Sequence, residues 1–244
     1  MMTYTTLKAN PRKFLALTGL TPAEFGLLYA PFSRAYESLY LPDRTLAGRP
    51  RQRVPGGGRH GALYPDQPKL LVLLVYLKTY PLQVVLGELF NLSQPQVNSW
   101  IHRLLPILRS ALDELGALPE RDPTHFAQGQ RRPGPAPRLI IDGTERRRQR
   151  PKSPEKQRLH YSGKKKTHSD KNVVIVEAPR RRIGFLGQTC PGSTHDKKVA
   201  DQARICYPPG AVLYKDTGFQ GYEPAVKRSC QAKKKAAPRG TDRR

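Results

Sequence analysis

Apolar positions in the first part of the chain follow a helical spacing. In the stretch TPAEFGLLYAPF, Thr21 precedes Pro22, and the apolar residues Phe25 and Leu28 lie three positions apart. This spacing places apolar side chains on one helix face, and threonine and proline are favoured at the N-cap and first position. We therefore expect residues 1–48 to form an N-terminal helical segment.

The next stretch breaks this pattern and then restores it. RPRQRVPGGGRHG is rich in glycine, proline and arginine, so we assign residues 49–61 to a flexible basic linker. PDQPKLLVLLVYLKTYP follows and is strongly apolar over the length of a helix. This segment predicts the core helix of a small helical domain.

Two shorter helices are expected in PLQVVLGELFNLSQPQVNSWIHRLLPIL. Apolar residues recur at helical spacing on both sides of NLS, and Ser93 is a favourable N-cap for the second helix. The pattern predicts a helix-turn-helix DNA-binding domain over residues 62–117. An ordinary helical hairpin gives the same pattern and is the alternative. In a helix-turn-helix, these polar side chains of the second helix would reach base edges: Gln94, Gln96, Asn98 and His102.

The period changes after a second expected linker, residues 118–137. RLIID, NVVIVEAP and RRIGFLGQT are typical of strands, and the last two are expected to pair through a tight basic turn. THDKKVADQARI predicts a helix with Thr194 as its N-cap, and AVLYKD predicts a strand ending at Asp216. The order strand, strand, strand, helix, strand makes the whole chain a mixed α/β protein.

The charge of the chain points to a polyanionic partner. Its 244 residues include 43 Lys and Arg against 19 Asp and Glu, a net charge of +24. Neutralised phosphates release counterions, so nucleic acid is the usual partner of such a chain, with a membrane surface as the rival. No apolar run reaches the roughly 18 residues of a membrane span, and the N-terminus lacks a signal-like apolar core. Three widely spaced cysteines favour a reduced, cytoplasmic setting.

Two aspartates have the same local context. Asp142 and Asp216 each follow a short apolar run and precede a small flexible pair, Gly143-Thr144 and Thr217-Gly218. At the ends of adjacent strands they would repel each other unless a cation lay between them, and hard divalent ions take such oxygen ligands. Two metal ions about 4 Å apart can activate an attacking hydroxyl and stabilise the leaving oxygen of a phosphodiester. Ordinary strand-end or turn residues are the alternative.

A dense basic segment follows the first aspartate. Fourteen Lys and Arg lie between residues 143 and 182, against four acids. The loop from Arg146 to Lys171 could hold a DNA backbone, and a solvated basic hairpin without a specific role is the alternative. The candidate DNA contacts here are Arg146, Arg147, Arg148, Arg150, Lys164, Lys165 and Lys166.

Several motifs in order resemble one family. IDGTERRRQRP, YSGKKKTHSDKN, CPGSTHDKKVAD and YKDTGFQGY resemble the DDE transposases of bacterial insertion sequences, in the insertion-sequence-five group related to Harbinger elements. The resemblance implies a ribonuclease-H-like catalytic domain, here residues 138–244, that uses Mg²⁺, with Mn²⁺ as an alternative. It implies that Asp142 is the first catalytic and metal-binding acid and Asp216 the second. Asp196 recurs in the family without a metal role, and His195 is expected to act at a helix N-terminus rather than as a metal ligand.

The resemblance is incomplete at the C-terminus. The family has a third acid, a Glu on a downstream helix, whereas this chain ends QAKKKAAPRGTDRR. Glu223 is followed by Pro224 and is not expected to substitute. The resemblance is expected to stop after Lys233–Lys235, so the domain reads as truncated. It is either a decayed copy or the first product of a split reading frame, and it is expected to bind DNA but cut it poorly.

The leading function is that of a transposase that cleaves and joins DNA at element ends. The alternative is a catalytically inactive truncated transposase that acts as a DNA-binding repressor. The expected partners are double-stranded DNA of terminal repeats and target, and a second copy of the chain in a homodimer or larger assembly. No membrane and no small-molecule substrate are expected, and the location is the cytoplasm, in association with a bacterial nucleoid. A basic RNA-binding or structural protein is a weaker third possibility, because few aromatic residues accompany the basic ones.

Overall fold

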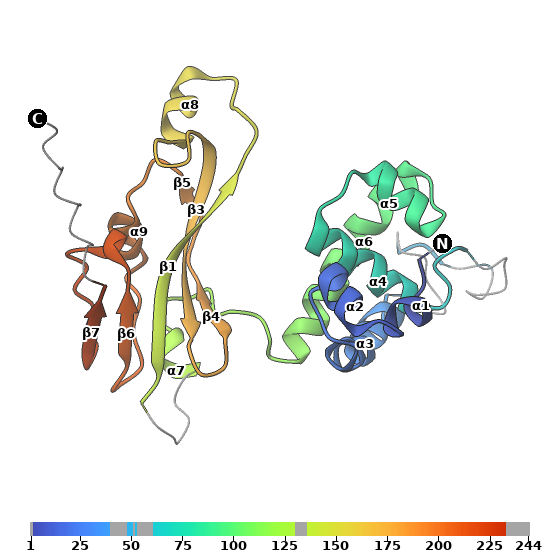
Figure 1. Cartoon of the computed structure of the whole chain (residues 1–244), viewed down its shortest axis with the longest axis horizontal. Coiled ribbons are helices and arrows are strands. Elements are labelled where there is room, and N and C mark those ends of the chain that lie inside the picture. Colours follow the sequence, from blue (N-terminus) through green and yellow to red (C-terminus); the bar gives the residue numbers. More distant parts are fainter. Residues whose placement is uncertain (1, 40–47, 51, 53–60, 130–135, 233–244) are drawn as a thin grey trace, which may run out of the picture. The chain divides into compact units, whose positions relative to one another are not determined.

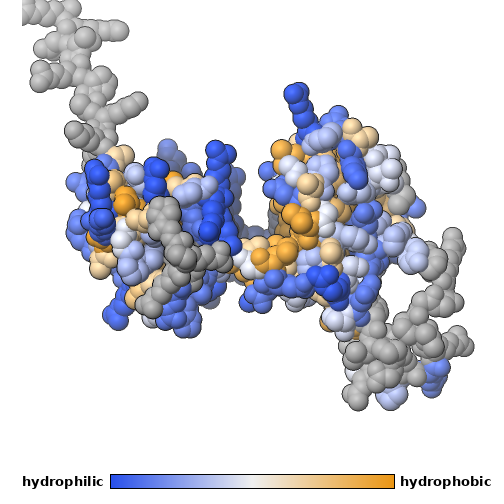
Figure 2. Space-filling model, turned by 90° about the horizontal axis from the view of Figure 1, so that it is seen from below, coloured by the Kyte–Doolittle hydropathy of each residue, from blue (hydrophilic) through white to orange (hydrophobic). Residues whose placement is uncertain are grey.

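The protein divides into two compact units, residues 1–118 and 119–244 (Figure 1). The computed structural model describes residues 2–39, 48–50, 52, 61–129 and 136–232. Hydrophilic side chains dominate the visible face of each unit in Figure 2, in line with a mean hydropathy of −0.62. Each unit has its own buried apolar cluster.

The first unit is helical in its described residues. Its helices are α1 (Tyr4–Lys8), α2 (Pro11–Thr18), α3 (Pro22–Glu37), α4 (Asp66–Thr79), α5 (Gln83–Phe90) and α6 (Gln94–Glu114). Thr21 is the N-cap of α3 as predicted, and its backbone N–H donates to the Glu24 carboxylate at 2.7 Å. In α4 the six apolar residues 70–75 are all buried. A helix that is apolar on every side must be enclosed by its neighbours, so α4 forms the centre of this unit.

The N-terminal helices share this core instead of forming a separate segment. Phe14, Phe25 and Phe32 are fully buried in the same cluster as residues of α4, α5 and α6. The sequence suggested a boundary because the glycine-rich stretch 49–61 interrupts the apolar pattern. Most of that expected linker lies outside the described residues.

The second unit is built on a mixed β-sheet, which confirms the mixed α/β class of the chain. Its strands are β1 (Arg138–Arg147), β2 (Tyr161–Ser162), β3 (Thr167–Glu177), β4 (Arg182–Leu186), β5 (Cys190–Pro191), β6 (Val212–Lys215) and β7 (Arg228–Gln231). Its helices are α7 (Phe126–Gly129), α8 (Pro154–His160), α9 (Asp196–Ala203) and the short 3₁₀ helix η1 (Thr217–Phe219). The sheet order is β2-β3-β1-β6-β7, and β4 and β5 also pair with β3.

The strand directions determine where the site lies. β1 pairs with β3 in antiparallel fashion and with β6 in parallel, and the β1–β6 register places Ile141 opposite Lys215. The buried residues Leu139, Ile141 and Leu213 pack with Val199 and Ala200 of α9 on one face of the sheet. Asp142 and Asp216, the next residues along the two parallel strands, therefore lie at the same level, where β6 ends and β1 continues beside β3.

Part of the expected linker 118–137 belongs to the second unit. The Glu120 N–H donates to the Gly184 carbonyl at 2.9 Å, and the Leu186 N–H donates back to the Glu120 carbonyl at 2.9 Å. Phe126 is buried and packs against Phe185. A single phenylalanine in a polar stretch gives no periodic signal, so the sequence pattern could not reveal this packing.

Two further expectations at the element level need correction. The basic segment expected as a loop contains α8 and β2, and β1 continues through Arg147 because its pairing with β3 extends to Ser169. The N-cap of α9 is His195 rather than Thr194. The Lys197 N–H donates to the His195 imidazole at 3.4 Å, which agrees with the structural role expected for that histidine.

Candidate active site

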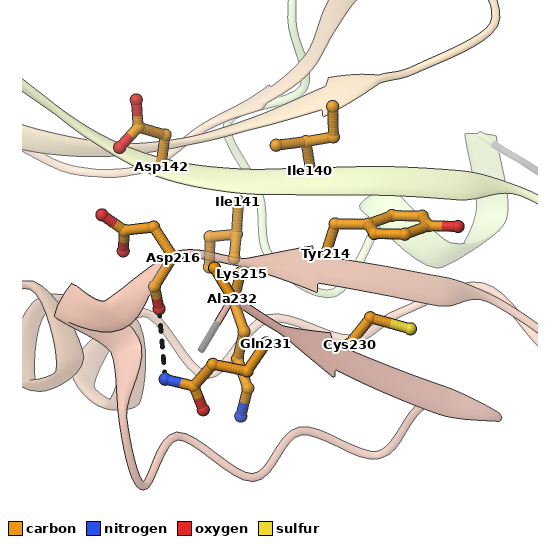
Figure 3. Close-up of a pocket in the computed structure, with 9 residues that line it drawn as sticks. All are labelled: Ile140, Ile141, Asp142, Tyr214, Lys215, Asp216, Cys230, Gln231 and Ala232. Carbon is orange, nitrogen blue, oxygen red and sulfur yellow. Dashed lines mark hydrogen bonds between the residues drawn. The ribbon is translucent and has the colours of Figure 1, made fainter. Parts of the chain in front are cut away.

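Asp142, in the middle of β1, and Asp216, the residue after β6, lie side by side. Figure 3 shows their carboxylates at the same end of the parallel strand pair. Each carboxylate accepts one local hydrogen bond, Asp142 from the Gly143 N–H at 2.7 Å and Asp216 from the Gly218 N–H at 2.9 Å. These bonds orient the two side chains, which remain exposed. The two acids come from neighbouring strands as predicted, but only Asp216 follows the end of its strand, because Asp142 lies within β1.

The two carboxylates offer a donor set suited to a hard cation. In the described part of the chain, no Lys or Arg side chain forms an ion pair with either of them. Neighbouring carboxylates raise each other's electrostatic energy, and a divalent ion relieves this while accepting their oxygen atoms as ligands. No group of three or more His, Cys, Asp or Glu is arranged as a metal cluster among the described residues. The pair fits an ion that takes its remaining ligands from water or substrate.

An open cavity of about 560 Å³ lies beside the pair. Its apolar wall includes Ile140, Tyr214 and Cys230, and the two aspartates line one end of it (Figure 3). The Gln231 side-chain amide, at the end of β7, donates to the Asp216 backbone carbonyl at 3.2 Å and so links β7 to the site.

A second cavity, of about 310 Å³, joins the first aspartate to part of the basic segment. It is lined by Asp142, Gly143, Thr144, Glu145, Lys164, Lys165, Lys171 and Asp196. Lys164 and Lys165 come from the turn between β2 and β3, about twenty residues along the chain from Asp142. The cavity thus combines a carboxylate that can hold metal with ammonium groups that can hold phosphate.

Three of the four arginines predicted to contact DNA also bind other side chains of the second unit. Arg146 donates to the Asn172 side chain at 2.8 Å, and Arg150 donates to Gln157 at 2.9 Å. Arg148 pairs with Asp170 at 3.0 Å, and His160 lies 2.8 Å from the same carboxylate. All four arginines are still exposed, and these contacts hold the basic hairpin in shape. In Figure 1, α8 lies at the upper end of β1 and β3.

Glu145 and Asp196 are acids near the site to which sequence reasoning gave no role. Burial raises the pKa of Glu145, but hydrogen bonds from Ser162 and Ser169 and the charges of Lys171 and Lys165 together lower it below its ordinary value. Asp196 lies 3.0 Å from the Lys171 ammonium. For Asp196, the sequence signal was the pair of glycines at 143 and 218, which follow the two aspartates and leave space for its carboxylate.

Glu223 does not join the aspartates. Its carboxylate is 80% exposed and lies 3.6 Å from the ammonium of Lys215, a buried residue of β6. Lys215 also donates a hydrogen bond to the Tyr222 backbone carbonyl. Glu223 therefore pairs with a buried lysine, and the expectation that it does not replace a third acid stays a prediction.

The predicted DNA-reading residues of the helical unit lie on α6. Gln94, Asn98 and His102 are exposed and four positions apart, so they form one stripe along the helix. Val97, Ile101 and Leu104, on the adjoining face of the helix, are buried in the core, and α5 packs against the same helix. Gln96 is also exposed, but its side-chain oxygen accepts from the Ser93 N–H at 2.9 Å. Ser93 is the N-cap, as predicted, and Gln96 takes part in capping.

Comparison with known families assigns both units. Residues 141–243 match the family described as DDE superfamily endonuclease, and residues 63–114 match the helix-turn-helix of DDE superfamily endonuclease. The two matches together cover well over half of the chain. The first extends past the lysines at 233–235, where the resemblance was expected to stop. No curated protein matches the chain. Among the described helices, none has both the length and the apolar character of a membrane span.

Proposed function

Because the chain belongs to the DDE superfamily of endonucleases, we propose that it is the transposase of a bacterial insertion sequence. It binds the ends of its element and carries out metal-dependent DNA strand cleavage and transfer. Residues 62–117 form the DNA-binding domain in this proposal, and residues 138–244 form a ribonuclease-H-like catalytic domain. Two ends must be joined, so the active form is a homodimer or a larger assembly.

The cavity that brings Asp142 together with Lys164 and Lys165 is the observation that carries this proposal. Asp142 and Asp216 would hold divalent metal, with Mg²⁺ as the expected ion. When bound, such an ion activates an attacking water or hydroxyl and stabilises charge on the leaving oxygen. Lys164 and Lys165 neutralise the DNA backbone and keep the scissile phosphate within reach of the two carboxylates.

The helical unit selects the DNA in this scheme. The α6 stripe of Gln94, Asn98 and His102 offers amide and imidazole groups that can donate to and accept from base edges in the major groove. The exposed Arg103 and Arg109 of the same helix supply charge for phosphate contacts. Binding at the element end then raises the local concentration of the phosphodiester to be cut.

A transposition assay tests the proposal. The coding sequence with its native flanking DNA is placed on a plasmid, and excision and insertion are scored for wild type, Asp142→Asn and Asp216→Asn. The proposal expects loss of at least about a hundredfold in each variant, because an amide is a poor ligand for a hard cation. Transposition at the wild-type rate by either variant would contradict it.

A DNA-binding repressor without catalysis is the second candidate. It requires only DNA binding, which the helix-turn-helix match at residues 63–114 supports. In that case the Asp142→Asn, Asp216→Asn double variant binds the element's DNA with unchanged or higher affinity, since two negative charges near the backbone are removed. It would also repress a separate active copy of the element as well as the wild type does.

A further inference from the structure

Asp196 occupies the space between two glycines that follow the candidate metal ligands, Gly143 in β1 and Gly218 in η1. A methyl group at Gly143 would lie 2.7 Å from Asp196 Oδ1. One at Gly218 would lie 2.9 Å from Asp196 Oδ2 and 3.1 Å from Asp216 Oδ1. These separations are shorter than ordinary van der Waals contacts of carbon, so glycine at both positions is what lets the Asp196 carboxylate enter.

Lys171 holds this carboxylate from the middle of the sheet. Its ammonium lies 3.0 Å from Asp196 Oδ1 and donates to the Thr194 backbone carbonyl at 2.9 Å. The side chains of Lys171 and Asp196 are only 9% and 18% exposed. An ion pair shielded from water in this way keeps its geometry, because separating the charges would leave one of them buried without a partner.

Four elements therefore meet at one carboxylate. β3 supplies Lys171, the first residue of α9 is Asp196, and Gly143 and Gly218 belong to the segments that carry Asp142 and Asp216. Because Asp196 contacts both glycine segments, it limits how far the two metal-ligand candidates can move relative to each other. Groups that orient metal ligands in this way commonly change metal affinity by about 10- to 100-fold when removed.

We propose that the Lys171–Asp196 pair is a positioning device that holds Asp142 and Asp216 at the separation needed to bind divalent metal. This rests on the proposed function, since it presumes that the two aspartates are metal ligands. Asp196 acts through its contacts with the segments at Gly143 and Gly218, and Lys171 acts through Asp196. Neither residue needs to touch the metal ion.

The helix α9 offers a matched control. Lys197 and Asp201 form a second lysine–aspartate pair on the same helix, with the ammonium 2.6 Å from the carboxylate. These side chains are 39% and 44% exposed, and neither lines the two cavities at the site. Replacing Asp201 removes the same charge and the same kind of ion pair without disturbing the segments at Gly143 and Gly218.

The test is Mn²⁺ affinity of the full chain, measured by electron paramagnetic resonance of free Mn²⁺, with melting temperatures recorded in parallel. Asp196→Ala removes the contact. Gly143→Ala displaces the same carboxylate from the other side without changing any charge. The backbone at Gly143 is not left-handed, so its conformation permits alanine, and the added methyl group acts on Asp196. Both variants should bind Mn²⁺ about 10-fold or more weakly than wild type, and Asp201→Ala should bind like wild type.

The outcomes separate this inference from the proposed function. If Asp142→Asn abolishes Mn²⁺ binding but Asp196→Ala and Gly143→Ala bind like wild type, the positioning role is overturned and the metal centre stands. A lowered melting temperature with unchanged affinity would show that the pair serves only the fold. If Asp196→Ala does not fold, Gly143→Ala alone decides. If wild type binds no Mn²⁺, or Asp142→Asn binds it normally, the metal centre itself is refuted, and this inference with it.

Discussion

Glu145 illustrates how single residues near the site depend on partners distant in sequence. It lies three positions after Asp142 on β1, and its carboxylate accepts from the Ser169 hydroxyl at 2.5 Å. Burial raises its pKa, but the bonds from Ser162 and Ser169 and the nearby charges of Lys171 and Lys165 lower the pKa below 4.5 overall. The ionised form is therefore the one that stabilises the folded chain.

The sign of this pKa change predicts a pH dependence. A carboxyl with a lowered folded-state pKa contributes stability above its unfolded pKa, near 4.5, and loses it as the pH falls through the folded value. Glu145→Gln should lower the free energy of unfolding at pH 7 by about 1 to 3 kcal/mol, the cost of a hydrogen bond to a charged group. The gap from wild type should shrink towards pH 3. Urea titrations at both pH values check this, with the exposed Glu88→Gln as control; a gap independent of pH would refute it.

The aspartates of the site could be predicted from sequence, but their support could not. Asp142 and Asp216 each end an apolar run, and that local pattern is enough to place one on each of two strands, although β1 continues past Asp142. The contact of Asp196 with Gly143 and Gly218 depends on how four separate elements cross, which no local pattern encodes. Only the glycines themselves hint at a close approach.

At the level of elements, the turn between α5 and α6 sets the direction of α6, the helix proposed to read DNA. Asn91 ends α5 in a left-handed conformation with φ 55°, and the Leu92 N–H donates to the Gly87 carbonyl at 2.9 Å. Gly87 is buried, and a methyl group there would collide with the Leu92 carbonyl oxygen. The turn therefore requires glycine at position 87.

Gly87→Ala should weaken both the fold and DNA binding. The collision is with backbone, so the turn must open, at a cost of about 1 to 3 kcal/mol. Gly26→Ala is the matched control, because Gly26 lies inside α3 with nothing within 4 Å of an added methyl group. That change should stabilise the helix by up to about 1 kcal/mol. Denaturant unfolding and DNA gel shifts measure both; equal effects of the two substitutions would contradict the role of the turn.

The basic turn before β3 should carry much of the DNA affinity of the second unit. Changing Lys164, Lys165 and Lys166 to glutamine should reduce the slope of log affinity against log salt by about 0.9 for each lost phosphate contact. The matched control changes Arg180, Arg181 and Arg182, at the other end of β3. Each triple removes three charges and contains one left-handed residue, Lys166 or Arg181, both with φ 51°. A larger loss from the arginine triple would argue against this placement of DNA.

Element boundaries show where sequence patterns fail. β1 was expected to end near Asp142, because the residues after it are charged, yet its ladder with β3 continues to Arg147. Backbone hydrogen bonds to β3 hold this extension of β1, and such bonds form whether the side chains are apolar or charged. The apolar strands and the helices of the first unit were predictable because burial imposes a period on their side chains.

At the scale of the whole molecule, the two apolar cores have no residue in common. The first includes Phe90 and has Trp100 packed against it, and the second includes Phe185. Trp100 is the single tryptophan of the chain, so its fluorescence reports unfolding of the helical unit alone.

Core substitutions should therefore act on one unit at a time. Phe90→Ala should destabilise the helical unit by about 3 to 5 kcal/mol and shift the fluorescence transition of Trp100 to lower denaturant. Phe185→Ala should leave that transition in place while lowering the unfolding midpoint of the sheet seen by circular dichroism. A shift of the Trp100 transition by Phe185→Ala would show that the units unfold together.

The central claim is that Asp142 of β1 and Asp216, which follows β6, form a divalent metal centre. Bound Fe²⁺ tests it directly, because with ascorbate and peroxide the ion generates radicals that cut the polypeptide beside its own site. The account predicts cuts next to both Asp142 and Asp216, suppressed by excess Mg²⁺ and lost in the Asp142→Asn, Asp216→Asn double variant. Cuts confined to other segments, or cuts that persist in the double variant, would contradict it.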